Sequence, residues 1–600
     1  MNPPMRTLNG GVPRVGLVRL SLLALIVGLV TGFGAVLFRD LIGLIHNALF
    51  LGRFSVHYDA NLFTHPSPWG PFVILVPVVG AIIVTFLVTN FAPEARGHGV
   101  PEVMDAIYYG GGIIRPVVAV VKSLASAFAI GSGAAVGREG PIIQIGSALG
   151  STLGQIIRMP AGQRIILVAA GAGAGIAATF NTPIGGVMFT IELMMPEVSV
   201  SSFLPVAIST SVATFVGRYY FGLQSAFDVP HLAPLAVDLE SALTLGLYGV
   251  LGAIVGVAAT AFVRGLHLAE DLFDKIGSRY LRHIFGMLLV GVLIYVLFLQ
   301  FDHYYVEGVG YATIQAILLG NLAAPGLLLL LFACKLFATS VSLGSGSSGG
   351  VFSPSLFLGA TIGGAFASLL KAAHLGLSLD VASFAIVGMG AMVGGGTGAV
   401  MTAVTMIFEM TRNYDIILPM ILAVAMSVGV RRLLSRENIY TMKLFRRGHA
   451  IPKALHANMF LVRRAVDVMD KDVVVMPADA SFEDLLARPD NNGRLRHVVV
   501  EDNGRIVGVM RVNTSLRTPA PGTSSAVKLR DLASRQFTLV RENDVAFDVI
   551  RRLWRRGATM ALVVPDSRAV PRAADVRGVI SKEHVADSVA NSINVYPAAG

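Results

Sequence analysis

Glu139 lies in the segment GREGP (137–141), whose composition suits a break in the backbone followed by the start of a helix. Glycine allows a tight turn, and proline is favoured in the first turn of a helix. The N-terminus of a helix presents unpaired N–H groups and the positive end of its dipole, which attract anions. The carboxylate of Glu139 could occupy such a site and, once protonated, leave it to a mobile anion. The alternative is that Glu139 only caps the helix or pairs with Arg138.

A related break occurs 213 positions further along the chain. Residues 131–150 (GSGAAVGREGPIIQIGSALG) share glycine, serine and proline positions with residues 344–363 (GSGSSGGVFSPSLFLGATIG). Phe352 takes the place of Glu139 in the second copy, so the first copy is specialised. Duplicated transporters place their substrate site where the broken helices of the two halves meet. The repeat therefore predicts a site between the two breaks.

A second repeated pair follows each break. FNTPIGGVMFTIELM (180–194) is echoed by GTGAVMTAVTMIFEM (396–410), so that Glu192 matches Glu409. Intramembrane acids are functional candidates by default, but the symmetry of this pair favours a structural role, with arginine or backbone as the partner. Lys335 and Arg115 are expected to snorkel or to pair.

The composition is that of an integral membrane protein. Of the 600 residues, 54% are hydrophobic and 14% are charged, whereas soluble domains carry about 25% charged residues. The net charge is +10, and the basic segment 431–438, which follows an apolar stretch, is typical of the cytoplasmic side. Scattered arginines without an aromatic-rich basic stripe do not favour nucleic acid as a partner. The single Cys334 excludes a disulfide framework, and we expect it to be a buried, inert thiol.

The apolar segments before residue 445 are often too short to cross a bilayer. A perpendicular helix needs about 20 residues, and irregular backbone at membrane depth survives only where protein or water surrounds it. We therefore expect helices that enter part-way and point their ends at a shared site. The predicted parts are an N-terminal cytoplasmic segment (1–16) and two membrane halves (17–225 and 226–445). The apolar segments lie near 17–38, 71–91, 117–136, 163–179, 184–195, 203–221, 241–263, 285–301, 326–343, 355–371, 383–408 and 416–430.

The tail contains two similar α+β units, 455–515 and 526–592. Each has a Val/Ile-rich strand, a helix that starts at Ser481 or Asn543, and then a strand–turn–strand. This pattern resembles a tandem pair of CBS modules. Nucleotide-binding pairs of that kind typically end a unit with an aspartate that holds a ribose, and the tail has other residues there. Adenine nucleotide binding is therefore less favoured than a scaffolding and dimerising role, and both alternatives stay open. The residues at the two ribose positions are Thr514 and His584.

Several motifs in order resemble the CLC family of chloride channels and chloride/proton antiporters, over nearly the whole chain. They are GHGVPE (97–102), GREGP (137–141), FNTPIGGVMFTIE (180–192), GGVFSP (349–354) and Tyr440, placed in the last membrane helix. The resemblance implies the CLC fold, an all-α polytopic membrane protein with two inverted repeats and broken helices, plus a C-terminal α+β tandem CBS domain. It implies a homodimer in the plasma (inner) membrane, with one anion pathway per subunit and the tail in the cytoplasm. Chloride or another small anion and protons would be its partners, without a metal or an organic cofactor.

The resemblance also assigns residues to the site, none of them catalytic. Glu139 would be the gate and proton acceptor. The amides of Val351 and Phe352 and the hydroxyl of Tyr440 would hold the central anion. Without the resemblance, Tyr440 would be interpreted as an interfacial anchor and Phe352 as core packing. The full set of anion-binding candidates is His98, Gly99, Gly137, Arg138, Val351, Phe352 and Tyr440.

Two positions depart from the family pattern. Many members have a serine, linked to chloride preference over nitrate, where this chain has His98. A neutral imidazole can donate one hydrogen bond and a protonated one adds charge, which predicts pH-dependent anion affinity; the alternative is that the ring turns away to a carbonyl. Leu193 replaces the inner glutamate that antiporters often carry. The neighbouring Glu192 lies about 100° around a helix, so it need not substitute.

These observations leave more than one function open. Chloride/proton antiport is the leading hypothesis, and Leu193 favours an uncoupled chloride channel as its alternative. A different class is an intramembrane serine protease, because Gly346-Ser347-Ser348-Gly349 matches a short G-x-S-G pattern. The lack of an obvious histidine partner in a nearby helix counts against that chemistry. Cation transport would require acidic residues along the path, and helix N-termini favour anions.

Overall fold

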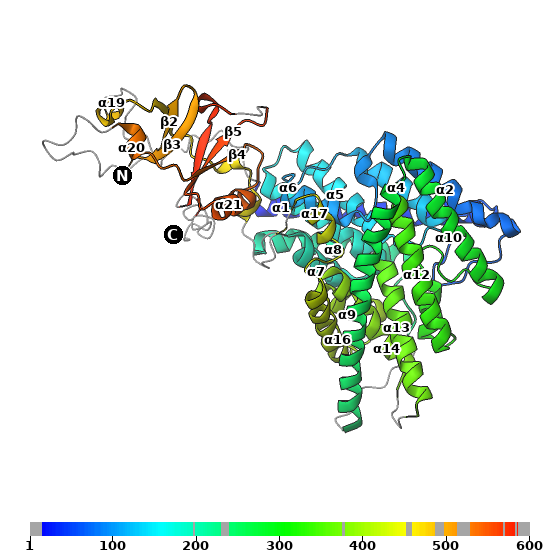
Figure 1. The fold of residues 1–600 in the computed structure, drawn as a ribbon. Helices are drawn as coiled ribbons and strands as arrows, with labels where there is room; N and C mark the ends of the chain where they lie inside the picture. The colour runs from blue at the N-terminus through cyan, green and yellow to red at the C-terminus, as the bar shows by residue number, and fades with distance from the viewer. Residues whose placement is uncertain are drawn as a thin grey trace. The chain divides into compact units, whose positions relative to one another are not determined.

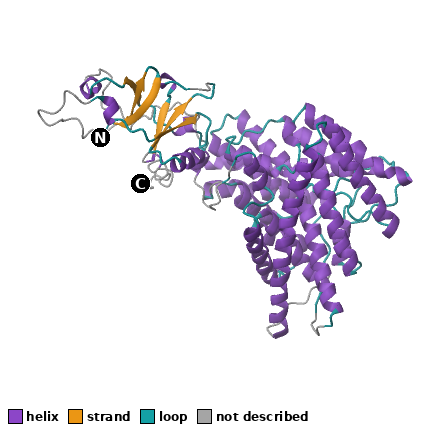
Figure 2. Cartoon of the chain, viewed as in Figure 1, coloured by secondary structure: helices purple, strands orange, loops and turns teal. Residues whose placement is uncertain are grey.

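The computed structural model divides into two compact units, Met1–Ile451 and Pro452–Gly600. The first is almost entirely helical, and the second combines short helices with strands (Figure 2). The finer boundaries expected within each unit stay predictions. The residues that the structure describes are 15–195, 198–229, 239–374, 379–449, 451, 459–486, 497–512, 528–567, 571–582 and 585.

The helical unit repeats one series of helices (Figure 1). The first half contains α1 (Leu17–Leu51), α2 (Val76–Asn90), α3 (Val100–Tyr108), α4 (Val117–Gly131), α5 (Glu139–Ile156), α6 (Ala161–Phe180), α7 (Pro183–Phe189) and α8 (Val200–Phe221). The second half contains α9 (Leu239–Asp274), α10 (Arg279–Phe301), α11 (Tyr311–Leu318), α12 (Pro325–Ser345), α13 (Phe352–Ala372), α14 (Val381–Thr397), α15 (Val400–Thr411) and α16 (Ile417–Leu434). The packing repeats too: α5 lies on α6 as α13 lies on α14, and α1 lies on α8 as α9 lies on α16.

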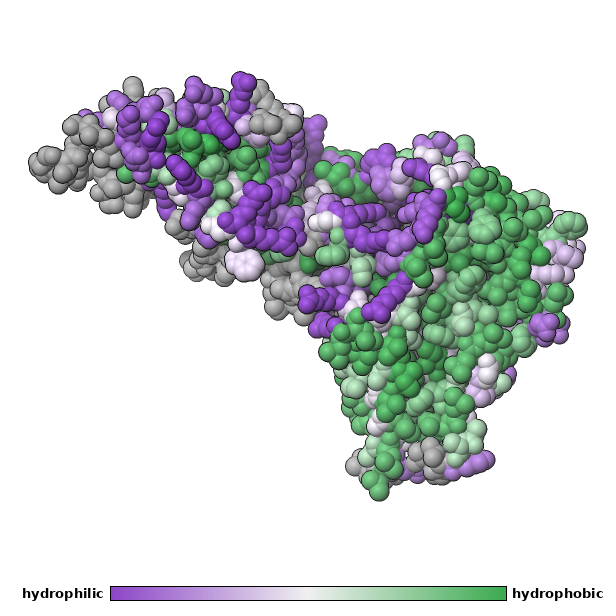
Figure 3. All heavy atoms as spheres, in the orientation of Figure 1, coloured by the Kyte–Doolittle hydropathy of each residue, from purple (hydrophilic) through white to green (hydrophobic). Residues whose placement is uncertain are grey.

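Within the described residues, 9 helices are long and apolar enough to cross a membrane. The helical unit presents a broad hydrophobic face in Figure 3, with hydrophilic side chains at its margins. Between the long helices lie the expected short ones, including α3 and α11. The apolar segment expected at 383–408 is two helices, because Gly398 adopts a left-handed φ of +77° that ends α14 before α15 begins. Broken helices are therefore a property of both halves.

Glycines let the central helices touch backbone to backbone. A Cβ added to Gly146 on α5 would lie 2.2 Å from the carbonyl oxygen of Gly171 on α6. A Cβ added to Gly359 on α13 would likewise lie 2.2 Å from the carbonyl oxygen of Gly388 on α14. The two halves thus use the same close helix crossing, as the small-residue runs in the sequence favour.

Each half also contains a buried lysine that holds a loop. Lys122 on α4 donates to the carbonyl oxygens of Ala95 (2.9 Å) and Gly97 (2.7 Å). Lys335 on α12 donates to those of Val306 (2.9 Å) and Gly308 (2.7 Å). Both lysines are 0% exposed, so Lys335 does not snorkel; of the two expectations, it pairs, and its partners are backbone carbonyls. The partners of each lysine are carbonyls of a loop, which lie outside the hydrogen-bond pattern of an α-helix or a sheet.

The remaining charged candidates behave as structural groups. Arg115 forms the expected ion pair, with Glu94 at 2.6 Å. Glu192 accepts from the amides of Val400 (2.7 Å) and Thr402 (2.9 Å) at the start of α15. Glu409 accepts in turn from the amides of residues 184 (3.1 Å) and 185 (2.7 Å) at the start of α7. The two acids therefore cap helices of the opposite half, which confirms the backbone alternative. Cys334 is only half-buried, which corrects the expectation of a buried thiol.

The described residues of the tail unit form two three-stranded sheets of the same topology. In the first sheet β1 (Val473–Pro477) is parallel to β2 (His497–Asp502), which is antiparallel to β3 (Arg505–Arg511). In the second, β4 (Phe537–Arg541), β5 (Met560–Val564) and β6 (Gly578–Ser581) repeat that order. Apolar residues of both sheets form one shared cluster, which includes Val499, Val509, Leu562 and Val579.

The helix starts expected in the tail are partly confirmed. Ser481 forms reciprocal hydrogen bonds with Asp484 at the start of α19 (Phe482–Leu486). In the second unit α21 (Ala546–Arg555) begins after Val545, later than the Asn543 start expected from the sequence. Thr514 and His584 lie outside the described residues, so the nucleotide hypothesis stays a prediction.

Candidate functional site

Three loops that each precede a short or buried helix lie side by side in the helical unit. Gly137 and Gly350 exchange two backbone hydrogen bonds, of 2.7 and 2.6 Å. The amide of Gly97 donates to the carbonyl oxygen of Ser347 (3.2 Å), and the amide of Gly349 donates to that of Gly97 (3.3 Å). The breaks of the two halves are therefore joined directly, as the repeat predicts.

Glycines make this meeting sterically feasible. Gly99, at the N-cap of α3, has φ of +79°, and a Cβ there would lie 2.7 Å from the carbonyl oxygen of Gly140. A Cβ on Gly140 would lie 2.1 Å from the carbonyl oxygen of His98. Side chains are excluded at these positions, so the starts of α3, α5 and α13 approach one another. Each start carries amides that lack an acceptor within the helix, which makes the junction suited to negative charge.

Glu139, the first residue of α5, is 0% exposed and reaches across to the other half. Its Oε2 accepts from the amide of Ser353 (3.3 Å), in the first turn of α13. Its Oε1 accepts from the hydroxyl of Ser353 (2.5 Å) and from the hydroxyl of Tyr311 (2.5 Å). The carboxylate therefore occupies the N-terminus of a helix that it does not belong to, instead of pairing with Arg138.

Aromatic rings and a cation surround this carboxylate. Tyr311 is the first residue of α11, and the ring of Phe227 packs edge-on against it at 5.4 Å. The guanidinium of Arg138 lies over the Tyr311 ring, 5.2 Å from its centroid. The ring of Phe180 lies 5.7 Å from that of Phe352. Arg138 thus contributes a positive charge through a ring contact, and Phe352 packs beside the site.

His98 lies at the same junction with its ring unpartnered. The side chain is 1% exposed, and within the described part of the chain neither ring nitrogen has a hydrogen-bond partner. The structure therefore does not contain the carbonyl contact that was one alternative for this ring. Burial, and after it the charge of Lys443, lowers the pKa of His98 well below its usual range. A neutral ring has one N–H donor to offer, and the charged form proposed for pH-dependent affinity is disfavoured.

Tyr440 is buried close to His98, with 6.2 Å between the ring centroids. Its expected place in the last membrane helix is wrong, because α16 ends at Leu434 and Tyr440 is the N-cap of the short α17 (Thr441–Arg446). Asn438 starts α17 by accepting from the amide of Tyr440 at 2.9 Å. The loop before α17 brings the ring to the junction, and its burial excludes an interfacial anchor.

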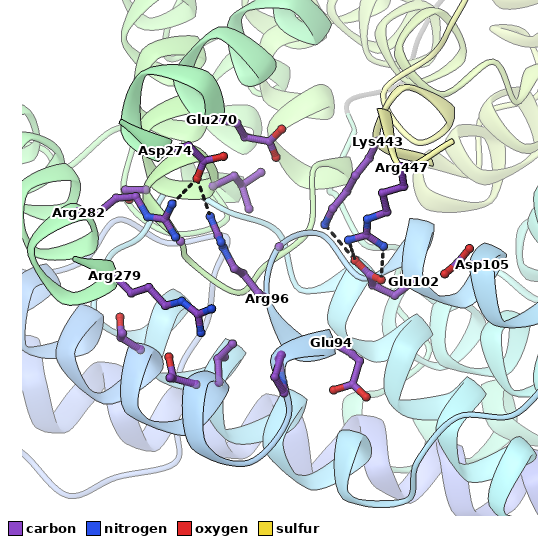
Figure 4. Close-up of a pocket in the computed structure, with 18 residues that line it drawn as sticks. Glu94, Arg96, Glu102, Asp105, Glu270, Asp274, Arg279, Arg282, Lys443 and Arg447 are labelled. Atoms are coloured by element: carbon purple, nitrogen blue, oxygen red, sulfur yellow. Dashed lines mark hydrogen bonds and ion pairs between the residues drawn. The ribbon is translucent and has the colours of Figure 1, made fainter. Parts of the chain in front are cut away.

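A polar cavity of about 570 Å³ lies against the loops that carry Gly97 and Gly346 (Figure 4). Lys443 and Arg447 both point at Glu102, at 3.0 and 2.8 Å. Burial alone raises the pKa of Glu102, but Lys443 and Arg447 outweigh it and lower that pKa to about 2. This part of the cavity lining therefore holds fixed, paired charges at neutral pH. Its charged lining is Glu94, Arg96, Glu102, Asp105, Glu270, Asp274, Arg279, Arg282, Lys443 and Arg447.

Leu193 and Ser347 are the residues that bear on an inner proton acceptor and on a serine nucleophile. Leu193 is buried in a turn of π-helix (Thr190–Met194), and the neighbouring Glu192 is engaged as a cap. Ser347 does have a histidine partner, contrary to expectation: its Oγ lies 2.9 Å from Nε2 of His283, on α10. Both side chains are buried, and the carbonyl of Ser347 holds the loop at Gly97. This pair therefore braces the junction.

Tyr311 and Ser353 are absent from the site predicted from the sequence. A signal for Tyr311 exists, because Gly97-His98-Gly99 is matched by Gly308-Val309-Gly310 at an offset of 211. The residue after each motif begins a short helix, α3 or α11. Ser353 lies inside a quoted motif, but nothing in its neighbours indicates that its hydroxyl faces Glu139.

Comparison with known proteins identifies relatives for both units. The profile described as voltage gated chloride channel matches residues 80–432, and the CBS domain profile matches residues 465–512. The H(+)/Cl(-) exchange transporter ClcA of Vibrio cholerae is 38% identical over 381 residues, which cover 61% of this chain and 77% of that relative. The transporter of the same name from Yersinia pseudotuberculosis is 32% identical over 436 residues, which cover 71% and 87%.

Solved structures give the same picture. A slow cyanobacterial Cl-/H+ antiporter superposes with a TM-score of 0.63 at 26% identity, covering 72% of this chain and 98% of that one. The superposition on a eukaryotic CLC transporter has a TM-score of 0.59 at 19% identity, and it covers 95% of this chain and 98% of that transporter. The second likeness extends the shared fold to the tail.

Proposed function

The chain belongs to the voltage-gated chloride channel (CLC) family, and from that premise we propose that it exchanges chloride for protons across a membrane. It is an integral membrane protein, with helices that cross the bilayer and a CBS-type tail. Relatives at 32–38% identity are named H(+)/Cl(-) exchange transporters. The family assignment overturns the serine-protease alternative, for which the Ser347–His283 contact is otherwise suggestive.

One observation carries the proposal: Glu139 of the first half is seated on the amide of Ser353 in the second half, at 3.3 Å. In its ionised form the carboxylate satisfies helix N-terminal donors as an anion would. Protonation removes that charge, so the side chain loses its attraction and a transported anion takes the place. Anion movement and proton movement are then linked through one group that carries the proton and vacates the seat.

The central anion would be held in the junction by polar donors without full charge. The amides of Val351 and Phe352, the hydroxyl of Tyr440 and the single N–H of neutral His98 are suited to this. Partial charges bind a dehydrated anion with moderate strength, which permits it to leave again. A bare, unpaired ammonium would hold it too tightly for rapid transport.

The uncoupled channel stays the alternative, because Leu193 offers no inner proton acceptor and Glu192 is engaged at α15. Reconstitution into vesicles with an imposed chloride gradient distinguishes the two functions. An exchanger drives protons uphill, and its reversal potential departs from that of chloride alone. If protons fail to move and the reversal potential equals the chloride potential, the chain is a channel.

We further infer that two copies associate in the membrane, as the family resemblance implies. The helices α7, α8, α15 and α16 expose apolar side chains, including Ile184, Phe215, Met401 and Leu418. A lipid-facing surface has the same composition, so the test is direct: single-molecule subunit counting in lipid should give pairs. A cytoplasmic tail and a scaffolding role for it are part of the same proposal.

A further inference from the structure

The hydroxyl groups of Tyr311 and Ser353 form a closed triangle with Glu139. Both hydroxyl oxygens lie 2.5 Å from Oε1 of Glu139, and they lie 2.7 Å from each other. All three side chains are buried. They come from three elements, α5, α11 and α13, which belong to both halves.

Each hydroxyl has one hydrogen, and both can donate to Oε1 of an ionised Glu139. No hydrogen then remains for the 2.7 Å contact between the two hydroxyl oxygens, so the strength of the two bonds to the carboxylate decides which form is favoured. An ionised acceptor makes such bonds about twice as strong as neutral ones. When the carboxylate leaves, one hydroxyl can donate to the other, so the pair is not left unsatisfied. The pair therefore stabilises the occupied state through the charge of Glu139.

Neither hydroxyl of the seat is among the donors assigned to the central anion, which are the amides of Val351 and Phe352, His98 and the hydroxyl of Tyr440. Ser353 directly follows Phe352 in α13, and Tyr311 comes from α11. The tyrosine is fixed in place by its own packing: Phe227 meets its ring edge-on at 5.4 Å, and Arg138 covers a face at 5.2 Å. A rigid ring presents its hydroxyl without further loss of rotamer entropy.

We propose that Tyr311 and Ser353 are positioning residues that hold the ionised Glu139 in its seat and thereby set the pH and chloride concentration at which the gate opens. The inference rests on the proposed exchange function. Each hydroxyl that is removed weakens the seat for the carboxylate, so protons and chloride displace Glu139 more easily. The two hydroxyls act through Glu139, and they have no role once its charge is gone.

The test uses the full-length protein in vesicles, with Tyr311→Phe, Ser353→Ala and the double variant. A hydrogen bond to a charged group is worth about 1.5–3 kcal/mol, and a tenfold change corresponds to about 1.4 kcal/mol. Each single variant should therefore shift the pH midpoint of chloride flux upward by about one unit. The chloride concentration for half-maximal flux should fall by about tenfold, without a matching change in maximal rate.

Two matched controls separate this role from a general structural one. Tyr304→Phe removes a tyrosine hydroxyl that accepts from the amide of Ser67 (3.2 Å), outside the seat. Thr361→Val removes a hydroxyl from α13 that donates to the carbonyl of Phe357 (2.9 Å). Both controls should keep the wild-type pH midpoint. In addition, Tyr311→Phe should not change the chloride concentration for half-maximal flux when it is combined with Glu139→Gln, since the charge of Glu139 is already absent.

The outcomes are distinguishable from those of the proposed function. If wild-type protein moves no protons under a chloride gradient, the exchange proposal fails. If it exchanges normally but the Tyr311→Phe and Ser353→Ala profiles match wild type, the positioning role alone is wrong. The positioning role would also be overturned if Tyr311→Phe changed the chloride concentration for half-maximal flux equally in the Glu139→Gln background. The hydroxyl would then act on the anion directly.

Discussion

The two halves of the helical unit are built on one scaffold. Lys122 and Lys335 each hold two loop carbonyls at 2.7–2.9 Å. The central helix pairs cross at glycines in both halves, and Glu192 and Glu409 cap each other's helices. These correspondences maintain backbone positions, because every one of them satisfies or accommodates a backbone group.

The halves differ at the few positions that face the junction. Glu139 is the first residue of α5 in the first half, and Phe352 takes the matching place at the start of α13 in the second half. The short loop that presents His98 in the first half has Val309 at the matching place, and Val100 is answered by Tyr311. Duplication thus supplies the broken helices, and substitutions at their starts supply the chemistry. The acid of one half then meets the hydroxyls of the other.

Replacement of Glu139 should have the largest effect on transport. Glu139→Gln removes the proton carrier and keeps the shape, so proton movement should fall to background while chloride flux continues and loses its pH dependence. A pH electrode and a chloride electrode on the same vesicles measure both. The matched control is Glu192→Gln, an acid on the shared scaffold, which should stay coupled. Persistent proton flux in Glu139→Gln would assign the gate elsewhere.

The lysine pair tests whether the scaffold is equivalent in both halves. Lys335→Met leaves the carbonyls of Val306 and Gly308 without a donor among the described residues, at about 1–3 kcal/mol apiece. After Lys122→Met, the carbonyl of Ala95 keeps the hydroxyl of Ser348 (2.6 Å) and that of Gly97 keeps the amide of Gly349 (3.3 Å). Lys335→Met should therefore lower stability by about 4 kcal/mol and Lys122→Met by less, measured by thermal unfolding in detergent. Arg115→Ala, which removes an exposed ion pair, should change stability by less than about 1 kcal/mol. Equal losses of stability in the two lysine variants would contradict this difference between the halves.

Glu102, in the charged cavity, has no acidic counterpart in the second half, where Thr313 takes its place. With its pKa lowered from 4.5 to about 2, Glu102 stabilises the folded state above pH 4.5, and the contribution disappears as the pH falls through about 2. The shift corresponds to about 3 kcal/mol. Unfolding of Glu102→Gln should show this loss at pH 7 and a smaller difference from wild type near pH 3. A pH-independent difference would contradict the ion-pair account.

The smallest expected effect is on anion preference. His98→Ser replaces the single donor of a neutral ring with a hydroxyl, which should change the chloride-to-nitrate preference by about tenfold or less. Since burial lowers the pKa of His98 well below its usual range, the neutral ring is favoured, and the preference of wild type should depend little on pH. Bi-ionic reversal potentials measure it. A preference that follows pH in wild type but not in His98→Ser would restore the charged-histidine hypothesis.

Much of the fold follows from the sequence because repeated glycines and prolines mark where helices break. The junction of 137–141 with 349–354 was predictable from the repeat alone, since broken helices of two halves converge in such proteins. The split at Gly398 was not, because periodicity cannot separate two consecutive apolar helices. The partners of Lys335 could not be identified either, because they are loop carbonyls, which every sequence contains.

The side-chain contacts of the site are less accessible to sequence reasoning. Ser353 and Tyr311 are 42 residues apart, and Tyr311 lies 172 from Glu139. Hydroxyls in an apolar chain commonly bond their own helix, so nothing local marks these two. The contact of His283 with Ser347 was missed for the same reason, since it joins α10 to a distant loop. Only the second, weaker repeat around Gly308 and Gly310 pointed to the position of Tyr311.

The central claim is that Glu139 and a transported anion compete for one place at the start of α13. Anomalous diffraction from crystals of wild-type protein and of Glu139→Gln, both grown in bromide, tests this directly. The account predicts a bromide peak within hydrogen-bonding distance of the Ser353 amide in the variant and none there in wild type with its carboxylate seated. No peak in the variant, or a peak beside a seated carboxylate in wild type, would contradict it.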